Sequence, residues 1–359
     1  MYQWLQRLFS RPPADEPAQA EPPAPAVVAA PEAPARAEPV PAAARPVVSF
    51  DQLDNVNRRF SHWLFQVEGE PEFDLSEVET QALEALATIV NSKQSGSALV
   101  RRMPGMLPQL LQSLRSDNFS GAQLARTISS DVVLVAAVIR MANGSLVGTG
   151  TQIASVEHAV MLIGQEGLRH LITSVAFRPI IDMNSGHFTR SLAPRIWDHS
   201  ERCAVANRQL AEAMGIDPFE AFLAGLVQNV GLIVALRILD QAAREQRHLG
   251  SELFCAELVR HARALTCGIG REWHFPENVT RAIAEQGGMK KGAVVSPLGR
   301  LLTLTDYLGK VRILVENDLA MFNDPALFGS LPANAGDAYR ALAPIDDPAA
   351  APAEAGSAP

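Results

Sequence analysis

The sequence predicts an all-α protein. Between about residues 50 and 316, apolar residues recur at spacings of three and four, which places them on one face of successive helices. Helix-capping residues precede several of these segments: Ser120, Asp131, Ser155, Ser251 and Ser296. No segment shows the apolar–polar alternation of a half-buried strand. We therefore expect helices packed on helices around one apolar core.

The composition of the chain limits which binding partners and which cellular compartment are expected. The chain has 359 residues, a net charge of −8 and a sequence pI of about 5.5. This acidic balance argues against a nucleic-acid partner, which needs a basic surface. Three cysteines without paired spacing favour a reduced, cytoplasmic setting. We also expect no membrane span, because no apolar run approaches the ~20 residues required, and no signal peptide.

The N-terminal residues 1–49 are expected to form a short amphipathic segment and a disordered tether. An apolar stripe at the start could dock weakly on a partner groove or a membrane surface, or could be a frayed end; it comprises Met1, Trp4, Leu5, Leu8 and Phe9. From residue 12 to 46 the chain is mostly Pro, Ala, Glu and Val, which bury too little apolar area to order the segment. Residues 319–359 are expected to be a largely disordered tail.

Residues 50–102 are expected to form a helical extension with two apolar stripes. The stripes could pack on a partner, but packing into the core of the main domain is the favoured interpretation. They comprise Phe50, Leu53, Val56, Phe60, Trp63 and Leu64, then Leu83, Leu86, Ile89 and Val90.

The main domain is expected to span residues 103–318, with an N-terminal half at 103–186 and a second half at 187–318. In the first half, capping residues and length make the Val-rich run VVLVAAVIRMA a helix rather than a strand. His158 and His170 lie on helices of this half and are interpreted as structural.

Two central helices carry polar residues on their inward faces. The stretch IWDHSERCAVANRQLAEAMGIDPFEAFLAGLVQNVG predicts two helices joined by a Gly-Ile-Asp-Pro turn. His199 shares the apolar face of the first helix. Asn229 shares that of the second, which is expected to continue without interruption to Leu236 and beyond, and Gln228 lies at the edge of the same face.

These residues carry a family resemblance. The stretches MPGMLPQLLQSL, RMANGSL, IASVEHAVMLIG, IWDHSERCA, EAFLAGLVQNVG and REWHFPENVTRAIAEQ resemble the HDOD domain, a degenerate branch of the HD phosphohydrolase superfamily, over roughly residues 103–310. The resemblance implies a helical subdomain packed on an HD-like bundle. It also implies a role in bacterial signal transduction, often alongside cyclic-di-GMP systems.

The resemblance also identifies what the HD site has lost. His199 corresponds to the first metal ligand and Asp306 to the last, while Gln228 and Asn229 replace the central His-Asp pair. His261, Trp273 and Glu285 are a possible ligand cleft beside that site.

Two neutral amides are poor substitutes for a His-Asp pair. Divalent cations that catalyse phosphoester hydrolysis need imidazole and carboxylate ligands. We therefore expect no catalytic residue, no metal and no cofactor. Instead, His199, Gln228, Asn229 and Asp306 should form a hydrogen-bonded cluster, because an unpaired buried amide costs about 1–3 kcal/mol. An imidazolium or an arginine could neutralise Asp306.

Three functions remain open. The first is a non-catalytic signal-transduction module that binds other signalling proteins. The second is a sensor that binds a nucleotide or cyclic dinucleotide in the old active-site cleft. The third, least favoured by the amide pair, is a residual metal-dependent phosphohydrolase.

Overall fold

The computed structural model describes residues 47–70, 72–91, 173, 186–243, 249–287 and 294–342. Within these ranges the protein is helical and contains no strand, which confirms the all-α prediction. The expectations for the terminal segments 1–46 and 343–359, and those for His158 and His170, lie outside the described residues.

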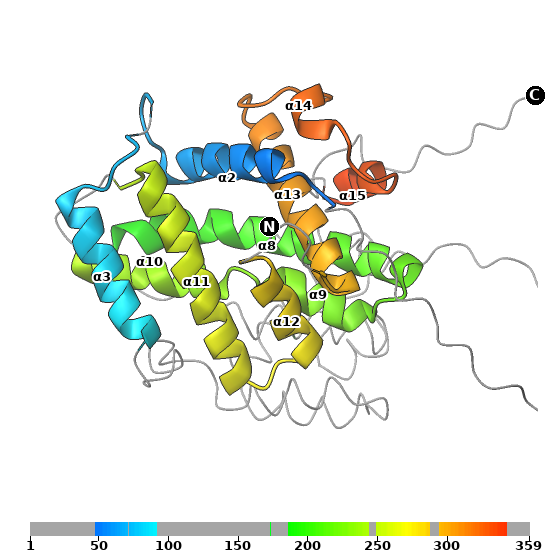
Figure 1. Cartoon of the computed structure of the whole chain (residues 1–359), viewed down its shortest axis with the longest axis horizontal. Helices are drawn as coiled ribbons and strands as arrows, with labels where there is room; N and C mark the ends of the chain where they lie inside the picture. Colours follow the sequence, from blue (N-terminus) through cyan, green and yellow to red (C-terminus); the bar gives the residue numbers. More distant parts are fainter. Residues whose placement is uncertain are drawn as a thin grey trace, which may run out of the picture.

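Helices α8 and α9 form the predicted central pair (Figure 1). Helix α8 spans His187–Ala211 and α9 spans Pro218–Val227. Between them Gly215 adopts a left-handed conformation with φ 65°, and the Asp217 side chain caps α9 by accepting from the Glu220 N–H. The two helices cross closely at Gly225, where a Cβ atom would lie 2.6 Å from the Ala204 Cα.

The second central helix is broken at the amide pair, so the expectation of one uninterrupted helix was wrong. After α9, Asn229 leaves helical geometry with φ −103° and ψ 9°, and α10 begins again at Val230–Ala242. The Thr266 hydroxyl lies 3.2 Å from the Gln228 carbonyl and accepts from the Gly231 N–H at 3.0 Å. A side chain from α11, Glu252–Glu272, therefore partners backbone groups on both sides of the break.

One stretch among the described residues, Pro218–Ala242, is long and apolar enough to cross a membrane. The sequence analysis expected none. Of its most apolar 18-residue window, 83% is buried inside the fold, and the stretch is the interrupted pair α9 and α10. Its apolar character follows from its position at the centre of the core.

The extension before residue 100 packs into the same core rather than standing apart. Helix α2, Phe50–Phe65, runs over α8 and α13, and α3, Glu77–Asn91, packs on α10 and α11 (Figure 1). The buried residues of the two predicted stripes are Val56, Phe60, Leu64, Leu83 and Leu86. The carboxylate of Glu79 ties α3 to the start of α11 by accepting from the Gly250 and Ser251 N–H groups at 2.8 and 2.9 Å.

Helix α13, Pro297–Glu316, packs against α8 and also against α12, Glu277–Glu285. The expectation of a largely disordered tail was wrong for residues 319–342, which include α14, Pro325–Phe328, and α15, Ala335–Ala341. Leu327 is fully buried, and its carbonyl accepts from the Tyr307 hydroxyl at 2.7 Å. Buried apolar residues such as Leu327 and Leu342, which are few in this part of the sequence, pack residues 319–342 against the domain.

Candidate functional site

His199 lies at the centre of the polar cluster that the sequence predicted. Its side chain is 1% exposed, and Nδ1 accepts from Asn229 Nδ2 at 3.3 Å. Its Nε2 lies 3.3 Å from the Asp306 carbonyl oxygen and 3.6 Å from Oδ1 of the same residue. Burial lowers the pKa of His199, and this effect outweighs the opposing attraction of Asp306. The contacts therefore fit a neutral imidazole that carries its proton on Nε2.

The two amides behave differently from one another. Asn229 donates to the Ser200 hydroxyl at 3.0 Å as well as to His199, as expected of a paired amide. Gln228 Nε2 is buried and has no nitrogen or oxygen partner among the described residues, so the expectation that both amides are paired was wrong for Gln228. This nitrogen has almost no accessible surface, and the side chain lies beside the Cys203 thiol, so Nε2 faces the interior of the protein rather than the solvent.

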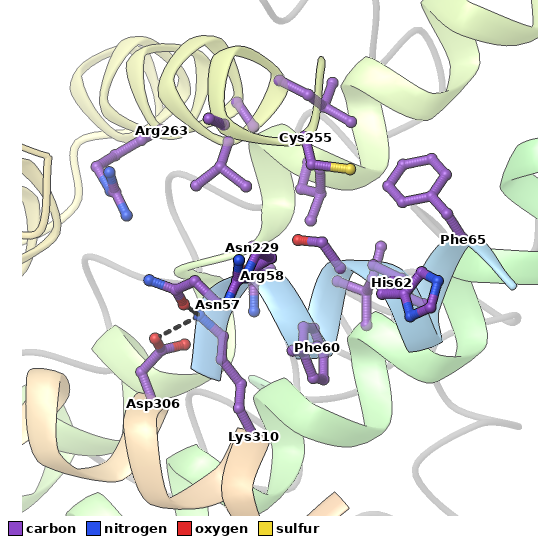
Figure 2. A pocket seen from close by; sticks show the side chains of 18 of the residues that line it. Asn57, Arg58, Phe60, His62, Phe65, Asn229, Cys255, Arg263, Asp306 and Lys310 are labelled. Carbon is purple, nitrogen blue, oxygen red and sulfur yellow. Dashed lines mark hydrogen bonds and ion pairs between the residues drawn. The ribbon is translucent and has the colours of Figure 1, made fainter. Parts of the chain in front are cut away.

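Asp306 is neutralised by a residue that the sequence analysis missed. Lys310 Nζ lies 2.6 Å from Asp306 Oδ2 and donates to Asn57 Oδ1 at 2.8 Å (Figure 2). Burial acts to raise the pKa of Asp306, but the positive charge of Lys310, supported by that of Arg263, more than offsets it, so the pKa is lowered. The expected cation was an imidazolium or an arginine. The structure has a lysine four residues along the same helix, a spacing that places both side chains on one face.

Cys203 lies close to His199 but is not an activated nucleophile. Its Sγ is 3.6 Å from His199 Nε2 and 3.4 Å from the Thr305 carbonyl oxygen. The thiol is fully buried, and burial raises its pKa well above the usual value. A thiol that stays protonated does not attack a substrate, so Cys203 is a core residue.

A cavity of about 450 Å³ opens beside the cluster, between α2 and α11. Figure 2 shows a polar end and an apolar end. The polar end is lined by Asp54, Asn57, Gln228, Asn229, Arg263, Asp306 and Lys310, and the apolar end by Leu64, Phe65, Phe73 and Leu253, with Leu258 and Val259 of α11 between them. Burial lowers the pKa of Arg263, whose guanidinium has no hydrogen-bond partner or ion pair within the described ranges.

Comparison with known families decides the identity of this domain. The family model for the HDOD domain matches residues 100–288, which is more than half of the chain. The chain belongs to the HDOD domain family. The match includes His199, Gln228, Asn229 and Arg263, whereas Asn57 lies before it and Asp306 and Lys310 lie after it. The candidate site therefore includes residues from segments outside the family match.

This HDOD protein shows distant similarity to one sequence relative and to two solved structures described here. A protein of Treponema pallidum (strain Nichols) is 21% identical over 217 residues, which is 58% of this chain and 40% of that protein. The chain thus spans less than half the length of this relative. An HDOD domain protein from Geobacter sulfurreducens is 17% identical, with a TM-score of 0.48 over 74% of this chain and 89% of its own. A candidate metal-dependent phosphohydrolase from Shewanella amazonensis is 20% identical, with a TM-score of 0.48 over 74% and 98%.

The donor set of this HDOD site does not fit the divalent metal of the HD superfamily. No group of three or more His, Cys, Asp or Glu side chains suited to a metal occurs among the described residues. The Nε2 of His199 is turned to the Asp306 oxygens, and an ammonium already contacts the Asp306 carboxylate. A metal bound to Asp306 would lie beside the positive charge of Lys310, which disfavours it.

The three residues expected to line a cleft do not line this cavity. His261 is buried, lies 3.1 Å from the Arg260 guanidinium through Nε2, and has a pKa lowered by burial. Trp273 packs in the core against Phe275, with ring centroids 6.0 Å apart. Glu285 accepts from the Ser296 N–H and hydroxyl at 3.1 and 2.7 Å and so supports the start of α13. In this structure all three side chains make contacts that stabilise the fold, through packing or through hydrogen bonds.

Proposed function

We propose that this HDOD protein is a non-catalytic signal-transduction module that works through binding. The observation that carries the proposal is the contact of the Lys310 ammonium with Asp306 and Asn57. Family membership supports the signalling part. The alternative of a residual phosphohydrolase is disfavoured by the same contact.

Lys310 neutralises the Asp306 carboxylate but cannot activate a water molecule as a metal does. A divalent metal promotes phosphoester hydrolysis by lowering the pKa of a bound water and by clamping phosphate oxygens. An ammonium neutralises a carboxylate and donates hydrogen bonds, but it has no open coordination position. The amides of Gln228 and Asn229 add neither charge nor a strong nitrogen ligand. The side chains gathered here can therefore bind polar groups but lack the means to activate water.

Metal content and hydrolysis measured together test this proposal. Full-length protein dialysed against manganese should retain less than one tenth of an equivalent, and should not hydrolyse bis-p-nitrophenyl phosphate or cyclic di-GMP. The matched gain-of-site variant is Gln228→His/Asn229→Asp/Lys310→Ala, which should retain manganese. Adding Asp306→Asn to it should remove that manganese. Stoichiometric metal in the parent protein, with turnover that is lost in Asn229→Ala, would contradict the proposal.

Partner binding has a candidate surface next to α14. Leu319, Met321 and Phe322 are 45%, 78% and 57% exposed, although large apolar side chains are usually covered. Pull-downs should compare the full-length protein with a variant lacking residues 1–49 and with Leu319→Ser/Met321→Ser. A specific partner lost only with the double substitution would assign the α14 surface. One lost only with the truncation would assign the N-terminal segment, and recovery of none by the full-length protein would contradict a binding role.

A further inference from the structure

The cavity between α2 and α11 has the size and chemistry of a ligand pocket. Its volume of about 450 Å³ falls within the ~300–1,000 Å³ typical of small-molecule sites. Such sites combine apolar walls with a few convergent polar groups, as this cavity does. One wall is α2, an element that the HDOD family model does not include.

The polar end holds hydrogen-bond donors that no described residue uses. The Arg263 guanidinium points into this end (Figure 2) and has no acceptor within reach in the described part of the chain. The Asp306 charge does not satisfy Arg263, because Lys310 holds that carboxylate at 2.6 Å. The Arg263 guanidinium is therefore left without an ion pair among the described residues, and a desolvated cation is stabilised when an acceptor pairs with it.

The other end of the cavity suits an apolar body. Leu64 is buried there, while Leu253 is 36% and Phe73 is 62% exposed at the rim. Arg58 and Glu252 form an ion pair at 3.5 Å across α2 and α11. That pair is self-neutralising, and the other charged groups that line the cavity, Asp54, Arg263, Asp306 and Lys310, lie at the polar end.

We infer that this cavity binds an organic monoanion, with a carboxylate or phosphate head on Arg263 and an apolar body between α2 and α11. Arg263 is the lining cation that contacts no described carboxylate, and the Asp54 carboxylate in the same lining disfavours a second negative charge on the ligand. A cyclic dinucleotide carries two phosphodiester charges and would bring the second one to apolar walls. The inference goes beyond the proposed function by naming a ligand class, and it is tested without any metal or turnover.

Calorimetric titration of the full-length protein, in the presence of a chelator, tests the inference. The probes are decanoate and, as a neutral analogue of the same chain length, decanol. Decanoate should saturate one site and bind at least about 10-fold more tightly than decanol, since a hydrogen bond to a charged group contributes about 1.5–3 kcal/mol. Failure of decanoate to saturate at 1 mM, or equal affinity for decanol, would overturn the inference.

Matched variants on α11 locate the head group. Arg263→Gln should weaken decanoate binding about 10-fold or more. Arg260→Gln is the control, because Arg260 lies one turn away, is exposed and pairs with Glu257; it should leave the affinity unchanged. Leu253→Asp places a carboxylate at the apolar end, ten residues before Arg263 on α11, and should also weaken binding. Equal losses for the two arginine variants, or cyclic di-GMP binding that depends on Arg263 and displaces decanoate, would refute the assignment.

Discussion

Replacing Lys310 with methionine is the most direct perturbation of the polar cluster. Methionine keeps most of the side-chain length and removes the charge, so Asp306 loses its nearest cation. The two side chains are 16% and 21% exposed, and Nζ lies 2.6 Å from Oδ2. Removing one partner of a buried ion pair costs about 3–5 kcal/mol. Because both groups retain some exposure, we expect Lys310→Met to lower the free energy of unfolding by about 2–3 kcal/mol at pH 7.

The pH dependence of this loss identifies its cause. The pKa of Asp306 is lowered in the folded protein, so the ion pair stabilises the fold above the unfolded-state value near 3.8. That stability is lost as the pH falls through the folded-state pKa. The difference between parent and variant should therefore be largest near neutral pH and should shrink below about pH 4.

Urea unfolding at several pH values measures both quantities. Arg340→Met is the control, because Arg340 pairs with Asp337 on the surface, where the side chains are 74% and 63% exposed. That variant should lose no more than about 1 kcal/mol. The double variant Lys310→Met/Asp306→Asn should recover most of the loss, since neither member of this pair is then left as an uncompensated charge. A Lys310→Met protein that is as stable as the parent, or a loss that does not change with pH, would refute the reasoning.

Three further perturbations test how the site is held. Glu79→Gln should reduce the free energy of unfolding by about 2 kcal/mol above pH 5, because the buried Glu79 carboxylate accepts from two loop N–H groups and has a lowered pKa. The control substitution Glu77→Gln, at an exposed neighbouring position, should leave this free energy unchanged. Gly225→Ala should cost about 1–3 kcal/mol in thermal unfolding, because its Cβ would lie 2.6 Å from Ala204 Cα. Asn229→Ala should raise the His199 pKa measured by NMR if loss of the Nδ1 contact admits water; an unchanged titration would contradict that role.

Most of the architecture could be predicted because it follows local rules. The inward face of α8, the turn at Gly215 and the Ser296 cap all depend on residues close in sequence. The break at Asn229 could not be predicted, because the apolar rhythm of residues 222–236 runs through it unchanged. It is stabilised by Thr266, which is distant in sequence and satisfies the freed backbone groups.

The candidate site was predictable in part for the same reason. His199, Asn229 and Asp306 were placed together correctly from the helix faces and the family resemblance. Lys310 had a usable signal, since it stands four residues after Asp306 on a predicted helix. Asn57 had none, because its contact with Lys310 joins residues 253 positions apart. Long-range contacts of this kind depend on the tertiary packing of α2, which no local pattern encodes.

The lysine also explains why α2 can close over the site. Lys310 holds the Asn57 amide oxygen at 2.8 Å, and the Phe60 ring lies over His199 with centroids 5.5 Å apart. A hydrated metal at this position would contact α2 through its bound water, whereas the Lys310 ammonium donates a hydrogen bond directly to Asn57 of α2. Asn57→Ala should therefore speed hydrogen exchange of α2 amides by about 5-fold, equivalent to about 1 kcal/mol for this exposed contact, and leave those of α3 unchanged. Chelators should change neither exchange rate, and a chelator that loosened α2 would show that a metal, not Lys310, holds the helix in place.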